Sequence, residues 1–256
     1  MQVSESYLDP LQLVERLDRS LARLGTDYID IYQIHWHSRA AVGNKQYPDR
    51  PLAAEVPLEE TLRALDTLRK GGKIRHIGVC NFGVADLRAA IATGVPIVSN
   101  QVCYNLLWRG IETELVPLCI EHGISILPWS PLQQGILTGK FETADTVPEG
   151  RQRTRLFSGK RPFARHGEAG QEDMVFAALD KLRKIAATID APMATASLAW
   201  VLGRPAVACV LMGARNAEQV SPPPPPHTHT PQSPLCCLPA PAPPATAHRR
   251  LLARAL

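Results

Sequence analysis

The sequence has little that a membrane protein or a nucleic-acid-binding protein needs. Its 256 residues contain no apolar run near the roughly 18 residues of a membrane span. Residues 1–5 carry neither the basic nor the apolar part of a secretion signal. The formal net charge is only +4 and the basic residues are scattered, so no dense basic stripe is predicted. We therefore expect a cytoplasmic chain with no nucleic-acid partner and no membrane partner.

The cysteines also lack the pattern of a metal site. There are six, without C-x-x-C or mixed Cys/His spacing. Four of them lie in apolar stretches and are expected to be reduced core residues: Cys80, Cys103, Cys119 and Cys209. Residues 227–230 read His-Thr-His-Thr, but they lie in a proline-rich tract, which favours low-complexity sequence over a metal site. No metal is predicted.

What the sequence does contain is one domain followed by a tail. Hydrophobic residues make up 45% and charged residues 20%, enough for one sizeable core. The composition changes at Ser221, and residues 222–244 are dominated by proline, which cannot supply helix or sheet hydrogen bonds. We predict a domain over residues 1–220 and a disordered, low-complexity tail over residues 221–256.

Short apolar runs alternate with amphipathic stretches along this domain, which is typical of parallel βα units. Strands are predicted at residues 28–35, 74–81, 97–104, 124–129 and 207–212. Helices are predicted at residues 10–24, 58–70, 84–93, 111–122, 172–189 and 195–202, with a large loop over residues 132–171. The first helix should be capped by Asp9 and ended by Gly25, with an apolar face of Leu13, Val14, Leu17, Leu21 and Leu24.

Five strands correspond to about five of the eight units of a (β/α)8 TIM barrel, which would here be incomplete. The rival fold is an open five-stranded sheet of flavodoxin type. That fold would show a glycine-rich phosphate loop after its first strand, where this chain has His35-Trp36-His37.

Several stretches, in order, resemble the aldo-keto reductase family over residues 9–220. They are SLARLGTDYIDIYQIHW, EETLRALDTLRKGGKIRHIGVCNF, SNQVCYN, ILPWSPLQQGILTGKF and VLMGARNAEQV. The resemblance implies an α/β barrel that reduces small aldehydes or ketones to alcohols with NADPH. Catalytic and cofactor-binding groups of such barrels lie at the carboxyl ends of the strands.

The resemblance assigns a role to each of four strand-end residues. His35 would orient the substrate carbonyl and assist proton delivery, and His37 would be a loop residue. Asn81 and Gln101 would hold the nicotinamide carboxamide, with Cys80 in place of the usual serine. Trp129 would stack against the nicotinamide ring.

The resemblance also implies two phosphate-binding segments. Ser130, Leu132, Gln134 and Gly135 match the loop that passes over the pyrophosphate, and Lys140 is a further candidate there. Gly213, Ala214, Arg215 and Gln219 match the site of the adenosine 2′-phosphate, where Arg215 would favour NADPH over NADH. Ser221 and the proline run stand where the family has a glutamate and an asparagine that hold adenine.

The family's proton donor is a tyrosine assisted by a lysine and an aspartate, and no such set precedes residue 20. We therefore expect an incomplete chain, a partial or mis-spliced product with unpaired sheet edges, that retains only His35 of the catalytic group. Two alternatives stay open. One is a non-catalytic nucleotide-binding module such as an accessory subunit of a channel, and the other is a parallel α/β domain without a ligand.

Overall fold

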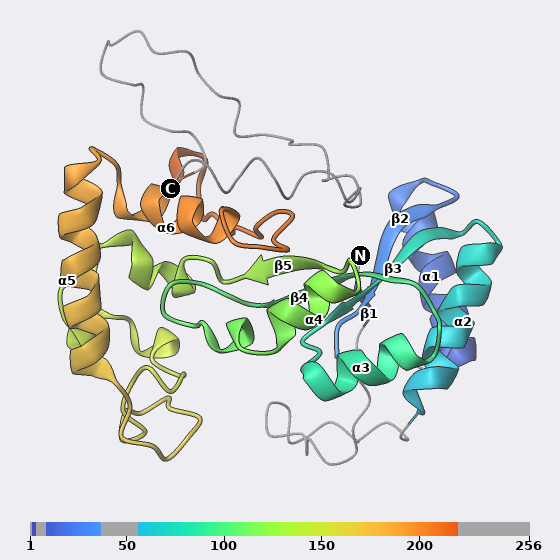
Figure 1. Ribbon diagram of the computed structural model, residues 1–256, viewed down its shortest axis with the longest axis horizontal. Helices are drawn as coiled ribbons and strands as arrows, with labels where there is room; N and C mark the ends of the chain where they lie inside the picture. The colour runs from blue at the N-terminus through green and yellow to red at the C-terminus, as the bar shows by residue number, and fades with distance from the viewer. Residues whose placement is uncertain (1, 4–8, 37–55, 220–256) are drawn as a thin grey trace, which may run out of the picture. The chain divides into compact units, whose positions relative to one another are not determined.

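The computed structural model describes residues 2–3, 9–36 and 56–219 (Figure 1). Contacts divide the chain into a first unit, Met1–Leu211, and a second unit, Met212–Leu256. His37, the loop before residue 56, Cys236, Cys237 and the proline-rich stretch lie outside the described residues. The predictions made for them stay predictions.

The alternation of strands and helices in the first unit is confirmed. The strands are β1 (Gln2–Val3), β2 (Ile29–Ile34), β3 (Ile74–Cys80), β4 (Ile97–Cys103) and β5 (Ser125–Trp129). The helices are α1 (Pro10–Leu24), α2 (Leu58–Lys70), α3 (Val84–Ala92), α4 (Leu115–Glu121), α5 (Glu172–Thr188) and α6 (Met193–Leu202). All neighbouring strands are parallel, in the order β1-β2-β3-β4-β5. The two-residue strand β1 was not predicted.

Helix α1 has the ends that its sequence predicts, but a narrower apolar face. The Asp9 carboxylate accepts hydrogen bonds from the N–H groups of Leu11 and Gln12, and Gly25 ends the helix at φ 67°. Leu13, Leu17 and Leu21 are buried. The prediction was wrong for Val14 and Leu24, which are 38% and 58% exposed because they lie beside the i, i+4 row and not on it.

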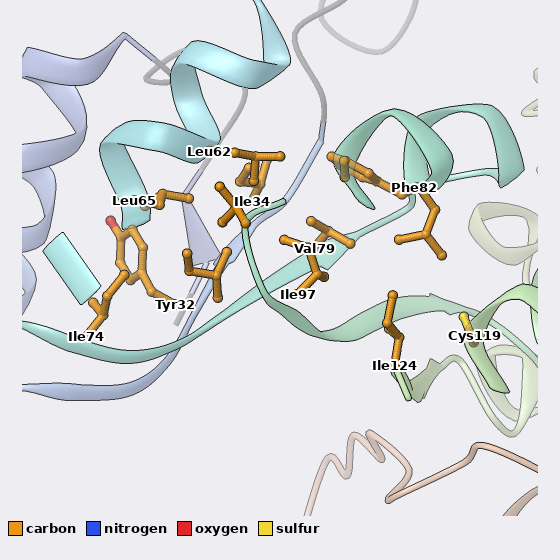
Figure 2. Close-up of a cluster of buried hydrophobic side chains, with 14 of the residues drawn as sticks. Tyr32, Ile34, Leu62, Leu65, Ile74, Val79, Phe82, Ile97, Cys119 and Ile124 are labelled. Carbon is orange, nitrogen blue, oxygen red and sulfur yellow. The ribbon is translucent and has the colours of Figure 1, made fainter. Parts of the chain in front are cut away.

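The main core lies between the sheet and the helices α1 to α4. Figure 2 shows Tyr32 and Ile34 of β2 beside Leu62 and Leu65 of α2. Farther along the sheet the same cluster takes in Val79, Ile97 and Ile124 together with Phe82 and Cys119. This packing fixes the strands, and therefore fixes the positions of the residues at their carboxyl ends.

The predicted helix over residues 111–122 is broken into two pieces. A 3₁₀ turn, Gly110–Glu112, precedes α4, which begins at Leu115. Pro117 lies in the first turn of α4, where its missing N–H is not needed. In one continuous helix its ring would clash with the carbonyl of Thr113, so the helix restarts instead.

The predicted strand over residues 207–212 is present only as two isolated parallel bridges, Ile126 with Val207 and Trp129 with Leu211. Ile126 donates to Ala206 O at 2.7 Å and accepts from Ala208 N at 3.2 Å. The next residue of β5 that faces this segment is Pro128, which has no N–H to donate. The ladder breaks there, and Leu211 N bonds to Pro128 O at 2.9 Å.

The loop predicted over residues 132–171 contains short 3₁₀ turns and forms a second core with α5 and α6. Its buried residues include Ile136, Leu137 and Phe157, which pack with Val175 and Met193. Arg161 fastens the loop to the start of α5 through a bidentate ion pair with Glu172, at 2.6 Å for both contacts. The loop is therefore held by its own core and by this ion pair.

The described residues bear on two sequence-based predictions, one about membrane spans and one about buried cysteines. Among these residues no single helix is both long and apolar enough to span a membrane, and α5 with α6 meets that test only as a pair bent by 93°. Cys80 and Cys119 are buried, Cys103 is partly buried, and none of the three forms a disulfide. Cys209 is exposed, so its assignment to the core was wrong; it lies in the irregular segment after Ala206.

Candidate functional site

The predicted site residues of the sheet gather at the carboxyl ends of β2 to β5. The register pairs Ile34 with Val79, Cys80 with Gln101 and Cys103 with Trp129. His35 therefore follows β2 beside the end of β3. Because the strands are parallel, their carboxyl ends lie at one edge of the sheet. The sequence predicted this convergence, and the structure confirms the positions, though not the roles.

Asn81 connects three of these strand ends. Its backbone has φ 61°, a left-handed conformation that asparagine adopts more readily than most residues. Its N–H donates to Gln101 O at 2.8 Å, and its side-chain Nδ2 donates to His35 O at 3.1 Å. Its Oδ1 accepts from the indole Nε1 of Trp129 at 2.9 Å. Asn81 therefore links the Trp129 indole to the backbone of His35.

Cys80 completes this network in the position that the resemblance gives to a serine. Its thiol lies 3.2 Å from Asn81 Nδ2, which donates to it, and it donates to Gln101 Oε1 at 3.4 Å. Both donor hydrogens of the Asn81 amide are thus engaged within the protein, while one lone pair of Oδ1 remains for a ligand N–H. A carboxamide ligand would find one acceptor on Asn81.

The Cys103 thiol lies beside Trp129 and is not a nucleophile. Burial disfavours the thiolate and raises the pKa of Cys103 to about 12. The same cause raises the pKa of Cys119 to about 11. Burial thus favours the protonated form of both thiols near neutral pH, which disfavours thiolate chemistry at these two positions.

The loop after β5 has an unusual backbone. Ser130, Gln133 and Gln134 have φ values of 52°, 46° and 54°, and Gly135 has φ 93°. Each non-glycine residue in this region costs of the order of 1–3 kcal/mol, and such costs are typical of functional loops. Helix α6 contacts this loop through Ser197, whose hydroxyl donates to Leu137 O at 3.4 Å.

Two cationic side chains lie at Gly135. A Cβ atom on Gly135 would stand 3.1 Å from Lys140 Nζ and 3.3 Å from Arg151 Nη1. Arg151 also donates to Gln134 O at 2.9 Å. A glycine with two cations beside it is a suitable place for an anionic group such as a pyrophosphate. Sequence reasoning assigned Gly135 to this loop and favoured a solvated side chain for Lys140, and it missed Arg151, which is 16 residues beyond Gly135 along an irregular loop.

The second predicted phosphate segment belongs to the second unit and is described by itself. Arg215 N donates to Gln219 Oε1 at 2.9 Å, and Gln219 N donates to Asn216 Oδ1 at 3.1 Å. These bonds close the 3₁₀ turn Ala217–Gln219. Gly213, Ala214 and Arg215 are exposed just before it. Within this segment the structure brings the Arg215 backbone and the Gln219 side chain together, and their role at a phosphate stays a prediction.

Sequence reasoning also missed two buried amides, those of Asn105 and Gln133, which are 0% and 4% exposed. The only sequence feature that could have indicated Asn105 is its position directly after the predicted strand 97–104.

A metal site is not found in the described part of the chain, where no three His, Cys, Asp or Glu side chains lie close enough together.

Parallel α/β folds, open or closed into barrels, bind ligands at the carboxyl ends of their strands, where this chain has amides, an indole and an imidazole-bearing residue. Residues 2–222 match the model of the Aldo/keto reductase family. The chain belongs to this family.

Two curated relatives and one crystal structure illustrate the similarity. The NADH-specific methylglyoxal reductase of Escherichia coli is 35% identical over 83% of this chain and 58% of its own. A putative voltage-gated potassium channel subunit beta of Schizosaccharomyces pombe is 33% identical over 81% of this chain and 56% of its own. An aldo/keto reductase of Klebsiella pneumoniae, crystallised with NADP and acetate, is 27% identical with a TM-score of 0.59 over 86% of this chain and 60% of its own. The chain thus spans less than two thirds of each.

Proposed function

We propose that this chain is the NADP(H)-binding portion of an aldo-keto reductase that converts aldehydes and ketones to alcohols. The observation that carries the proposal is the strand-end network in which Asn81 joins His35, Gln101 and Trp129. It lies at the edge where barrel enzymes bind ligands, and the Gly135 loop follows directly from β5. We take the fold as five of the eight units of a (β/α)8 barrel, within a domain over residues 1–220.

Each residue then has a specific task. The cofactor, when bound, supplies the hydride. Trp129 offers a ring face on which a nicotinamide can stack, and Asn81 Oδ1 and Gln101 provide acceptors for its carboxamide. Lys140, Arg151 and Gly135 receive the pyrophosphate, and Arg215 receives the 2′-phosphate. His35 orients the carbonyl of the substrate.

We further propose that the 256-residue chain binds the cofactor with little turnover. Of the catalytic group assigned from the resemblance, it contains His35 but no tyrosine, lysine and aspartate set at strand ends among the described residues. General acid catalysis contributes roughly 10²–10⁴-fold to such reactions, so most of the rate should be absent. A module that binds the nucleotide without catalysis, of the kind suggested by the name of the S. pombe relative, is the second candidate.

The test is a fluorescence titration of the purified 256-residue chain with NADPH and with NADH, followed by a turnover assay with an aromatic aldehyde. We expect saturable NADPH binding that is tighter than NADH binding. Arg151→Met should weaken NADPH binding about tenfold or more, because one charged hydrogen bond to phosphate is lost. Arg88→Met, an exposed position on α3, is the matched control and should leave it unchanged.

Each outcome tests a different part of the proposal. NADPH binding without turnover supports the nucleotide-binding portion or module, and turnover close to that of intact relatives would refute our assignment of the catalytic group. Equal affinities for NADPH and NADH would refute the role of Arg215. Failure to bind either nucleotide would refute the proposed function.

A further inference from the structure

The side chain of Asn105 is placed to control the conformation of the loop after β5. Asn105 lies two residues after the end of β4 and is fully buried. Its backbone pairs with Trp108 in both directions, with Asn105 N to Trp108 O at 3.3 Å and Trp108 N to Asn105 O at 3.0 Å. Its Oδ1 accepts from Leu107 N at 2.9 Å. This closed turn fixes the amide so that its NH₂ group points away from the turn.

Both hydrogens of that NH₂ group are used on the neighbouring loop. Asn105 Nδ2 donates to Ser130 O at 3.0 Å and to Gln133 Oε1 at 2.7 Å. Ser130 and Gln133 are two of the three non-glycine residues with left-handed φ in this loop. The amide therefore bonds to the residues whose backbone conformation is least favourable in isolation.

These contacts are costly to lose. Gln133 is 4% exposed, so its amide oxygen would remain buried without this donor, a situation that native proteins avoid. A loop released from Asn105 can return Ser130 and Gln133 to ordinary backbone conformations. That would move Gly135, and with it the place where Lys140 and Arg151 come together.

We infer that Asn105, through its paired hydrogen bonds to Ser130 O and Gln133 Oε1, is the positioning residue that presets the pyrophosphate loop of the cofactor site. It does not touch the cofactor. The inference rests on the proposed function, because it gives the loop a phosphate ligand. Preorganisation of this kind raises affinity since the loop is not ordered at the moment of binding.

The experiment compares variants of the full 256-residue chain by hydrogen exchange, NADPH titration and thermal unfolding. Asn105→Leu replaces the amide by an apolar group of similar size. Gln133→Met removes the acceptor and leaves the turn at Asn105 intact, so it serves if Asn105→Leu does not fold. The matched control is Asn100→Leu: Asn100 is also fully buried on β4, but its amide donates to Phe82 O at 2.9 Å.

Hydrogen exchange tests the positioning without any cofactor. The N–H groups of Gln133, Gly135 and Leu137 are bonded within the loop. We expect Asn105→Leu and Gln133→Met to speed exchange of these amides, and Asn100→Leu to affect amides near Phe82 instead. Unchanged exchange at residues 133–137 in both loop variants would overturn the inference, whatever the binding result.

The titration tests the consequence for function. Both loop variants should bind NADPH about tenfold more weakly or worse, and the double variant should be no worse than Asn105→Leu alone, because Asn105→Leu already removes the bond to Gln133 Oε1. Asn100→Leu should lose thermal stability but keep its affinity. Equal losses of NADPH affinity in Asn105→Leu, Gln133→Met and Asn100→Leu would show a general structural effect and overturn the inference. If the unaltered chain binds no NADPH while exchange changes as expected, the proposed function fails and the cofactor role of Asn105 fails with it, but the positioning of the loop stands.

Discussion

Replacing Glu172 by glutamine should destabilise the chain strongly at neutral pH and progressively less as the pH falls below about 4.5. The Glu172 carboxylate receives two contacts of 2.6 Å from Arg161 and a third, also 2.6 Å, from the N–H of Ser158. The side chains of Glu172 and Arg161 are only 22% and 19% exposed, so water screens the pair less than a surface ion pair. Hydrogen bonds to charged groups contribute about 1.5–3 kcal/mol each. The substituted amide would keep one acceptor oxygen, so we expect a loss of about 2–3 kcal/mol at pH 7.

The sign of the pH dependence follows from the carboxyl group. Hydrogen bonding by Arg161, aided by Ser158, holds the pKa of Glu172 below its ordinary value of 4.5 and outweighs the effect of burial. A lowered pKa means that the stabilisation is fully present above about pH 4.5 and is lost as the pH falls through the folded-state pKa. The difference between the two proteins should therefore shrink below pH 4.5.

The assay is urea unfolding of both proteins from pH 7 to pH 3. The control is Asp180→Asn, which removes the exposed Asp180 partner of Arg183 on α5 and should change the free energy of unfolding by no more than about 0.5 kcal/mol. A Glu172→Gln effect at pH 7 as small as that of the control, or one that is as large at pH 3 as at pH 7, would refute the reasoning.

Two further predictions concern the core and the first helix. Leu65→Ala, at a position with 0% exposure between α2 and the sheet, should lower the free energy of unfolding by about 2–5 kcal/mol. Leu11→Ala, at 82% exposure, should change it by less than about 0.5 kcal/mol in the same urea titration, and similar effects at both positions would contradict the packing described for the core. Asp9→Ala should cost about 0.5–2 kcal/mol by removing the helix cap, whereas Asp9→Ser should retain most of the stability; circular dichroism melting compares the two, and an equal loss would argue against capping.

The sequence predicted the elements of the sheet well because their cause is local. Helix α2 has the predicted bounds, Leu58–Lys70, because its own apolar periodicity and the glycine pair directly after it mark where it begins and ends. The segment 207–212 was harder to predict. Its own residues suggest a strand, but its pairing depends on the missing N–H of Pro128, a residue about 80 positions earlier.

The site could be predicted in position but not in its bonding. Residues at the ends of parallel strands must lie near one another, so His35, Asn81, Gln101 and Trp129 could be grouped from the sequence. The hydrogen bond from Trp129 Nε1 to Asn81 Oδ1 is made by a residue with a left-handed backbone, Asn81. No local sequence pattern predicts that backbone conformation. Arg151 reaches Gly135 only through the course of an irregular loop, which has no periodicity to interpret.

Pro128 also makes the two sides of β5 unequal in how easily they come apart. Toward β4 the strand is paired at every residue from Ser125 to Trp129, while on the other side only a few backbone hydrogen bonds hold residues 206–211. Regions with few such bonds open at a lower free energy than the core that they adjoin. Residues 206–211 should thus separate from this side of β5 at a lower free energy than the strands β2 to β5 separate from one another.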